Sequence, residues 1–162
     1  MNTAATRPFD RDTALRIARA FLPKHPLGNR WDYYYTLAKL RSDPLYPGVL
    51  QALRGSDAPV LDLGCGLGLL AHALRADDQH MAYRGVDNDA AKITRANKVA
   101  AKNALVDTRF DVVDLAGGPP AHQGSVAILD VLQYLDAQGQ RRLIAQVWAM
   151  LTPGARLVIR TA

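Results

Sequence analysis

The sequence predicts an α/β fold, in which a doubly wound parallel sheet follows an N-terminal helical extension. From Pro59 onward, short apolar runs alternate with helical patterns, and four such alternations occur before the sequence ends. Units of this length join parallel strands by right-handed crossovers. With 162 residues and a hydrophobic fraction of 49%, the chain is long and apolar enough for one domain with a real core.

Residues 1–56 are predicted to form a helical arm or lid that packs on the rest of the chain. One helix begins at Asp10 or Asp12 and ends near Leu22, before two prolines. A second helix covers about residues 31–40. A third begins around Ser42-Asp43-Pro44, a good helix-start pattern, and ends at Gly55.

The core is predicted to be residues 57–162, in which strands and helices alternate. The expected strands cover about residues 60–63, 82–86, 108–113, 126–129 and 156–159. The expected helices cover about residues 67–75, 89–103 and 137–151, and the second begins at the capping residue Asp89.

A glycine-rich turn follows the first strand of the core. Asp62 lies near the end of the strand, and Gly64, Gly66 and Gly68 then occur at every second position. Glycine lets the backbone approach a ligand closely, and the following helix start offers free N–H groups. The dinucleotide pattern G-x-G-x-x-G is not matched, because its third glycine position is Leu69.

A second acid follows the next predicted strand. Asp87 lies at the end of that strand, 19 residues after Gly68. A carboxylate at this place can accept hydrogen bonds from both ribose hydroxyls of a nucleoside.

These features, in this order, resemble the class I S-adenosylmethionine-dependent methyltransferases, whose fold is Rossmann-like. The resemblance covers about residues 59–160. It implies a five-stranded sheet of order 3-2-1-4-5, without the usual strands 6 and 7, because the sequence ends at Ala162. The segments that carry it are residues 62–68, 85–89, 109–115, 126–135 and 150–159.

The resemblance also implies S-adenosylmethionine as cofactor, with S-adenosylhomocysteine as product. The glycine loop would wrap the methionine end, Asp87 would hold the ribose, and Asp114 would accept the adenine amino group. The carbonyl of Asp130 would face the methionine amine. The implied cofactor-binding residues are Asp62, Gly64, Cys65, Gly66, Gly68, Asp87, Asn88, Asp114, Leu115 and Asp130.

Several of these residues have competing interpretations. Asp62 either braces the loop or contacts the methionine amine through water. Asp111 competes with Asp114 for the adenine, although strand alternation points Asp111 the other way. Cys65 is expected to be a small filler and not a nucleophile. His72, on the helix after the glycine loop, is expected at the surface.

The expected chemistry is an in-line displacement at the sulfonium methyl carbon. This reaction needs no obligatory base, so no catalytic residue can be named, and a single acid at Asp130 does not make a metal site. The segments Tyr33–Tyr35 and 39–47 are similar to methyltransferases encoded beside bacterial aryl-polyene or fatty-acid-like assembly genes. This implies a small-molecule or carrier-bound acceptor, with Tyr34, Tyr35 and Tyr134 as candidate acceptor-site residues.

The charge distribution leaves alternatives open. The formal net charge is +5, and residues 1–54, with nine Lys/Arg and four Asp, carry the whole excess. Such an arm suits an anionic partner, so a nucleic-acid or protein methyltransferase is one alternative. A truncated or non-catalytic cofactor-binding domain is another, and an oxidoreductase is the least favoured. With no long apolar run and no secretory signal, a cytoplasmic protein is expected.

Overall fold

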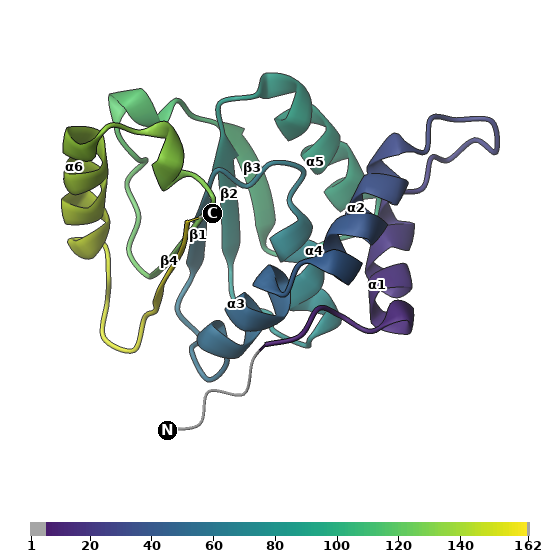
Figure 1. Ribbon diagram of the computed structural model, residues 1–162, viewed down its shortest axis with the longest axis horizontal. Coiled ribbons are helices and arrows are strands. Elements are labelled where there is room, and N and C mark those ends of the chain that lie inside the picture. The colour runs from purple at the N-terminus through teal and green to yellow at the C-terminus, as the bar shows by residue number, and fades with distance from the viewer. Residues whose placement is uncertain (1–5, 162) are drawn as a thin grey trace.

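A five-stranded parallel sheet forms the centre of the computed structural model, which describes residues 6–161 (Figure 1). The strands lie in the order β3-β2-β1-β4-β5, and all four neighbouring pairs are parallel. This confirms the predicted sheet and its order. The strands are β1 (Val60–Leu63), β2 (Tyr83–Asp87), β3 (Thr108–Val112), β4 (Ser125–Leu129) and β5 (Leu157–Arg160).

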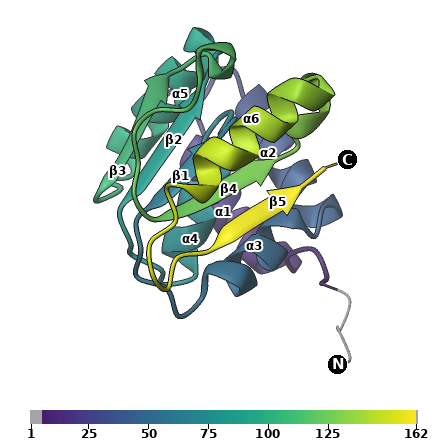
Figure 2. The same cartoon turned by 90° about the vertical axis from the view of Figure 1, so that its left-hand side faces the viewer.

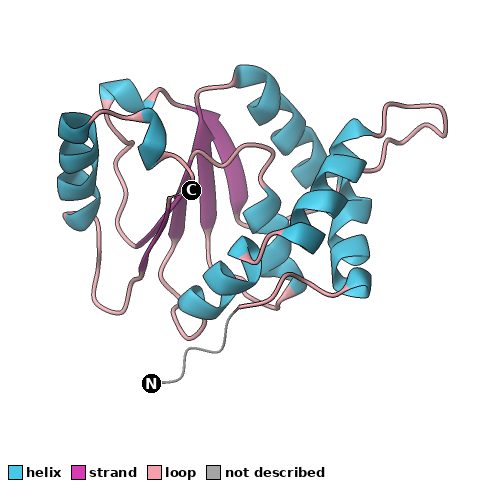
Figure 3. Ribbon diagram, in the orientation of Figure 1, coloured by secondary structure: helices cyan, strands magenta, loops and turns pink. Residues whose placement is uncertain are grey.

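Helices cover both faces of this sheet (Figure 3). Three of them precede β1 and form the arm, two follow β1 and β2, and one lies between β4 and β5. The α-helices within the described residues are α1 (Arg11–Ala18), α2 (Trp31–Ser42), α3 (Leu45–Leu53), α4 (Leu69–Ala76), α5 (Ala90–Lys102) and α6 (Ala137–Trp148). Short 3₁₀ turns are η1 (Arg19–Phe21), η2 (Leu115–Gly117) and η3 (Leu132–Tyr134).

Strand alternation divides the core into two clusters. Leu61 and Leu63 of β1 point toward α6, where they form a cluster with Leu143 and Val147. Val60 points to the opposite face, which α3, α4 and α5 cover. Figure 2 shows α6 lying across its face of the sheet, with β5 at the edge.

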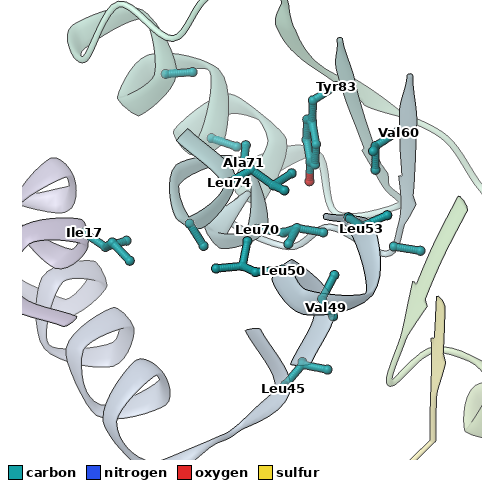
Figure 4. Close-up of a cluster of buried hydrophobic side chains, with 14 of the residues drawn as sticks. Ile17, Leu45, Val49, Leu50, Leu53, Val60, Leu70, Ala71, Leu74 and Tyr83 are labelled. Atoms are coloured by element: carbon teal, nitrogen blue, oxygen red, sulfur yellow. The ribbon is translucent and has the colours of Figure 1, made fainter. Parts of the chain in front are cut away.

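The arm shares the larger of these clusters with the sheet (Figure 4). Leu50 and Leu53 of α3 lie among Leu70 and Leu74 of α4, and all four are 3% exposed or less. Ile17 of α1 belongs to the same cluster. Because this cluster spans both parts of the chain, α1, α2 and α3 are held against the sheet by apolar packing.

The predicted boundaries differ from the observed ones by a few residues at helix ends. Helix α4 begins at Leu69 and not at residue 67, because Gly68 adopts a left-handed conformation with φ +77°. Helix α6 ends at Trp148, and the N–H groups of Met150 and Leu151 donate to the Val147 and Trp148 carbonyls in tighter turns. The prediction that His72 lies at the surface is wrong: it is 6% exposed, and the Phe21 ring lies 4.9 Å from its own.

Candidate functional site

A cavity of about 920 Å³ lies at the carboxyl ends of the strands, beneath α2. The loops after β1, β2, β3 and β4 form its floor, which is where a doubly wound sheet places ligands. Of the predicted cofactor-binding residues, Gly68 alone is not among the lining residues. The predicted residues that line the cavity are Asp62, Gly64, Cys65, Gly66, Asp87, Asn88, Asp114, Leu115 and Asp130.

The glycine loop is tied to the neighbouring strand by its backbone. The N–H groups of Gly64 and Cys65 both donate to the Val86 carbonyl, at 2.8 and 2.9 Å. A Cβ on Gly68 would lie 2.4 Å from the Phe110 ring. Gly68 therefore allows the loop to pack on β3, which explains the need for glycine at a position outside the cavity.

Asp87 is held to the glycine loop by its side chain. One carboxylate oxygen accepts the Gly66 N–H at 2.9 Å, and the other accepts the Asp89 N–H at 2.9 Å. Each oxygen has a further lone pair, so the carboxylate can accept two more donors in a fixed orientation. Asp87 and the glycine loop thus share one cavity, as the sequence predicts.

Asp62 is a buried acid with one free oxygen. It is 2% exposed, and its Oδ2 accepts the Tyr83 hydroxyl at 2.5 Å, whereas its Oδ1 has no partner. Burial raises the pKa of Asp62 to about 7, against the lowering effect of the Tyr83 hydrogen bond. A buried acceptor without a partner is unusual, and at the wall of a cavity it suits a cationic group.

Asp114 and Asp111 have different surroundings in the structure. Asp114 lines the cavity, and its Oδ1 accepts the Ala116 N–H at 2.9 Å. Asp111 instead pairs with Arg84 across β2 and β3, at 2.7 Å, and does not line the cavity. Of the two acids, only Asp114 is available to a ligand there.

The rest of the cavity lining, away from the glycine loop, contains residues that the sequence does not predict. Lys39 of α2 and Tyr46 of α3 line the cavity, as do Lys92 and Arg95 of α5. Burial raises the pKa of Tyr46, and the Asp62 carboxylate raises it further. Residues 39–47 carry a family resemblance, but no spacing within them indicates that Tyr46 lies at the cavity.

The candidate acceptor-site tyrosines fall in different places. Tyr35 and Tyr134 line the cavity, and Tyr134 is 82% exposed, at the rim. Tyr34 does not line it; this residue is exposed, and its ring lies edge-on to Tyr33. Burial raises the pKa of the Cys65 thiol, which therefore stays protonated in the loop.

The cavity floor is rich in acceptors, and its cations are already paired. Lys39 contacts Asp43 at 2.6 Å, and Arg95 contacts Asp32 at 2.7 Å. Because these cations are paired with other acids, the free oxygen of Asp62 favours a positively charged group on a ligand. The arrangement suits a nucleoside with a cationic end.

Across residues 6–161, no three His, Cys, Asp or Glu side chains lie together in a way that would hold a metal ion. None of the helices in this part combines the length and apolar character needed to cross a bilayer.

Comparisons with known proteins give a consistent result. A family profile described as a methyltransferase domain matches residues 60–154. A ubiquinone biosynthesis O-methyltransferase of Xylella fastidiosa is 29% identical over 107 residues, covering 65% of this chain and 42% of that protein. A carboxy-S-adenosyl-L-methionine synthase of Chromohalobacter salexigens is 31% identical over 106 residues, covering 63% and 39%.

Solved structures share the fold. The glycopeptide N-methyltransferase MtfA, complexed with sinefungin, has a TM-score of 0.60 at 19% identity, with 70% of this chain and 50% of that chain covered. The chain spans only about two fifths of the length of the curated relatives that it matches.

Proposed function

The chain belongs to the class I S-adenosylmethionine-dependent methyltransferase family, and from this premise we propose that its cavity binds S-adenosylmethionine for methyl transfer to a small-molecule or carrier-bound acceptor. The observation that carries the proposal is the link between Asp87 and the glycine loop, which join in one cavity at the strand ends. A nucleoside with an amino-acid tail needs a carboxylate at one end and open backbone at the other.

The lining residues fit this cofactor. Asp87 has two oriented oxygens for the ribose hydroxyls. A Cβ placed on Gly66 would meet no atom within 4 Å, so the loop leaves open space beside its backbone. The free Oδ1 of Asp62 is an acceptor for the methionine ammonium, and Asp114 with Leu115 offers an acceptor and an N–H for adenine.

Bound S-adenosylmethionine supplies a methyl carbon on a sulfonium leaving group. The residues of the chain then have to bind, orient and exclude water. Helix α2 roofs the cavity with Tyr35 and Lys39, and Tyr46 closes it from α3. Alignment of donor and acceptor in one enclosed site lowers the barrier by several kcal/mol. No base is needed when the acceptor is already nucleophilic.

A small or carrier-bound acceptor is supported by the shape of the arm side of the cavity. Tyr35, Leu45 and Tyr46 line this side, and Tyr134 and Leu135 of the segment after β4 line the side that faces it. Aromatic and apolar surface therefore adjoins the proposed methionine end. Aromatic side chains bind flat or apolar molecules well. The aryl-polyene or fatty-acid-like type of acceptor stays a prediction, as do the division at residue 56 and a cytoplasmic location.

The proposal is tested by calorimetry with S-adenosylhomocysteine on the wild type, Asp87→Ala and Asp111→Ala. We expect Asp87→Ala to weaken binding by about 2 kcal/mol, or roughly 30-fold, because two hydrogen bonds to a charged group are lost. Asp111→Ala is the matched control. It removes an acid at the end of a neighbouring strand that pairs with Arg84 outside the cavity, so affinity should stay within about twofold.

Equal affinity in the wild type and in Asp87→Ala would contradict the ribose role. The nucleic-acid alternative, which rests on the basic arm, predicts instead a binding constant for RNA or DNA that falls steeply with salt. A non-catalytic domain would bind both cofactor forms and transfer no methyl group to any acceptor tested.

A further inference from the structure

Arg160 is the last residue of β5, at the edge of the sheet, and it contacts two distant parts of the chain. Its side chain reaches Asp130, which follows β4, and Asp43, which lies between α2 and α3. These carboxylates are 30 and 117 residues away in the sequence. In Figure 2 the carboxyl end of β5 lies toward the helices of the arm, and β5 contacts α3.

The guanidinium binds both carboxylates with two donors each. Its Nη1 and Nη2 donate to the two oxygens of Asp43 at 2.5 and 2.9 Å. Its Nε donates to Asp130 Oδ1 at 2.8 Å, and Nη2 also donates to Asp130 Oδ2. Paired contacts of this kind fix orientation as well as distance, because the guanidinium is a rigid planar fork.

Asp43 fixes the junction of the two arm helices. Its Oδ1 also accepts the Leu45 N–H at 2.9 Å, at the start of α3, and its Oδ2 contacts Lys39 of α2 at 2.6 Å. Burial opposes the charge on Asp43, but the hydrogen bonds from Arg160 and Lys39 outweigh it and hold the pKa of Asp43 well below its usual range. Asp43 is therefore ionised at neutral pH.

Asp130 is held in a conformation that non-glycine residues rarely adopt. Its φ is +57°, and its N–H donates to the Arg160 carbonyl at 2.9 Å. Arg160 thus holds Asp130 through both its backbone and its side chain. A residue in this region persists only where its surroundings hold it there.

The two carboxylates belong to opposite sides of the cavity. The arm supplies Lys39 and Tyr46, and the loop after β4 supplies Asp130 and Tyr134. Arg160 and Asp43 are not among the lining residues. Arg160 and Asp43 therefore lie behind the lining residues, and their contacts with Asp130 and Lys39 join the two sides of the cavity.

We propose that Arg160 is a positioning residue that clamps the arm to the loop after β4 through Asp43 and Asp130, and so sets the shape of the cavity before a ligand enters. The proposal rests on the proposed function for the identity of the ligand. The clamp itself, which holds the two walls at a fixed distance, does not depend on which ligand binds.

The test compares Arg160→Gln, Asp43→Asn and the double variant with the wild type. Affinity for S-adenosylhomocysteine is measured by calorimetry well below each unfolding temperature, and hydrogen exchange is followed at the amides of α2 and α3. We expect each single variant to weaken binding about 10-fold, and the double variant to weaken it no further, because both changes open the same clamp. Exchange in α2 and α3 should accelerate in all three.

Arg84→Gln is the matched control. It breaks another Arg–Asp pair of 2.7 Å within the sheet, away from the cavity, and should leave both affinity and arm exchange unchanged. A purely structural role for Arg160 would lower the unfolding temperature while affinity stayed the same, and that result would overturn the proposal. If the wild type itself does not bind S-adenosylhomocysteine, the proposed function fails, and arm exchange alone decides: unchanged exchange in Arg160→Gln would overturn the clamp.

Discussion

The two sides of the cavity are built in different ways. The glycine-loop wall consists of residues 64–67 with Asp87 and Asp114, and each of these lies within a few residues of a strand end. The arm wall consists of Lys39 and Tyr46, and the Arg160 clamp joins it to Asp130. The first wall is local in sequence, whereas the second brings together residues more than 100 positions apart.

This difference shows which forces hold each wall. Backbone hydrogen bonds and positive φ angles shape the glycine-loop wall, so substitutions of its glycines should disturb it most. Apolar packing and ion pairs between side chains hold the arm wall, so changes to its buried and charged side chains should disturb it most. Three predictions test this contrast, in order of the effect expected.

Gly68→Ala should cause the largest loss, because it attacks the backbone of the glycine-loop wall. A Cβ there meets the Phe110 ring at 2.4 Å, and φ is +77°. We expect the free energy of unfolding to fall by about 4 kcal/mol, of which about 1 comes from φ and the rest from overlap. Chemical denaturation measures this loss.

Gly55→Ala is the control for that prediction. Gly55 has a φ of +82°, but a Cβ there would meet nothing within 4 Å. Its loss should therefore be about 1 kcal/mol. Similar losses in the two variants would mean that the Phe110 ring moves aside and that glycine at position 68 is needed for φ alone.

Acid should weaken the packing of the arm on α4 through His72. Burial and, to a lesser extent, the charge of nearby Lys102 lower the pKa of His72 from 6.5 to about 4. The unfolded chain therefore binds a proton at a higher pH than the folded chain does. The contribution of the neutral His72 to the free energy of unfolding is present in full above about pH 6.5. It falls by about 3 kcal/mol as the pH approaches 4.

The measurement is the free energy of unfolding against pH for the wild type, His72→Phe and His80→Gln. His72→Phe keeps a ring beside Phe21 and should lose this part of the pH dependence. His80 has an exposed side chain, so His80→Gln should follow the wild type. Parallel curves for the wild type and His72→Phe would contradict the assignment.

The smallest expected effect is the pH dependence of ligand affinity through Asp62. Since the pKa of Asp62 is about 7, the acid is largely protonated at pH 5.5 and cannot then pair with an ammonium group. Affinity for S-adenosylhomocysteine should rise by up to about tenfold per pH unit, or 1.4 kcal/mol, between pH 5.5 and 7. Asp62→Asn should bind more weakly with a flat profile, whereas Asp114→Asn should retain the slope. An unchanged slope in Asp62→Asn would exclude this role.

The contrast between the walls also explains what sequence reasoning could and could not predict. Strand β1 has the predicted bounds, and Asp89 caps α5 as predicted, because apolar runs and capping patterns are local signals. The sequence placed the glycine loop and Asp87 at two strand ends, but the hydrogen bond between Gly66 and Asp87 is visible only in the structure.

The missed features depend on tertiary contacts. His72 lies on a helix whose exposure is decided by the arm that covers it, and nothing in its own neighbourhood indicates Phe21. The Asp43–Arg160 pair joins a helix start to an edge strand, and each residue alone has the pattern of a surface charge. Only the path of the arm across the cavity brings the two together.

The two tryptophans occupy different environments on opposite faces of the sheet. Trp31 lines the cavity from α2 and is 69% exposed, whereas Trp148 lies on the outer side of α6 and is 70% exposed. Both indoles should therefore emit at the long wavelengths of solvated tryptophan, and only Trp31 lines the cavity. The chain thus carries a built-in optical reporter, and Trp148→Phe would leave a single tryptophan, whose emission should track occupancy of the cavity.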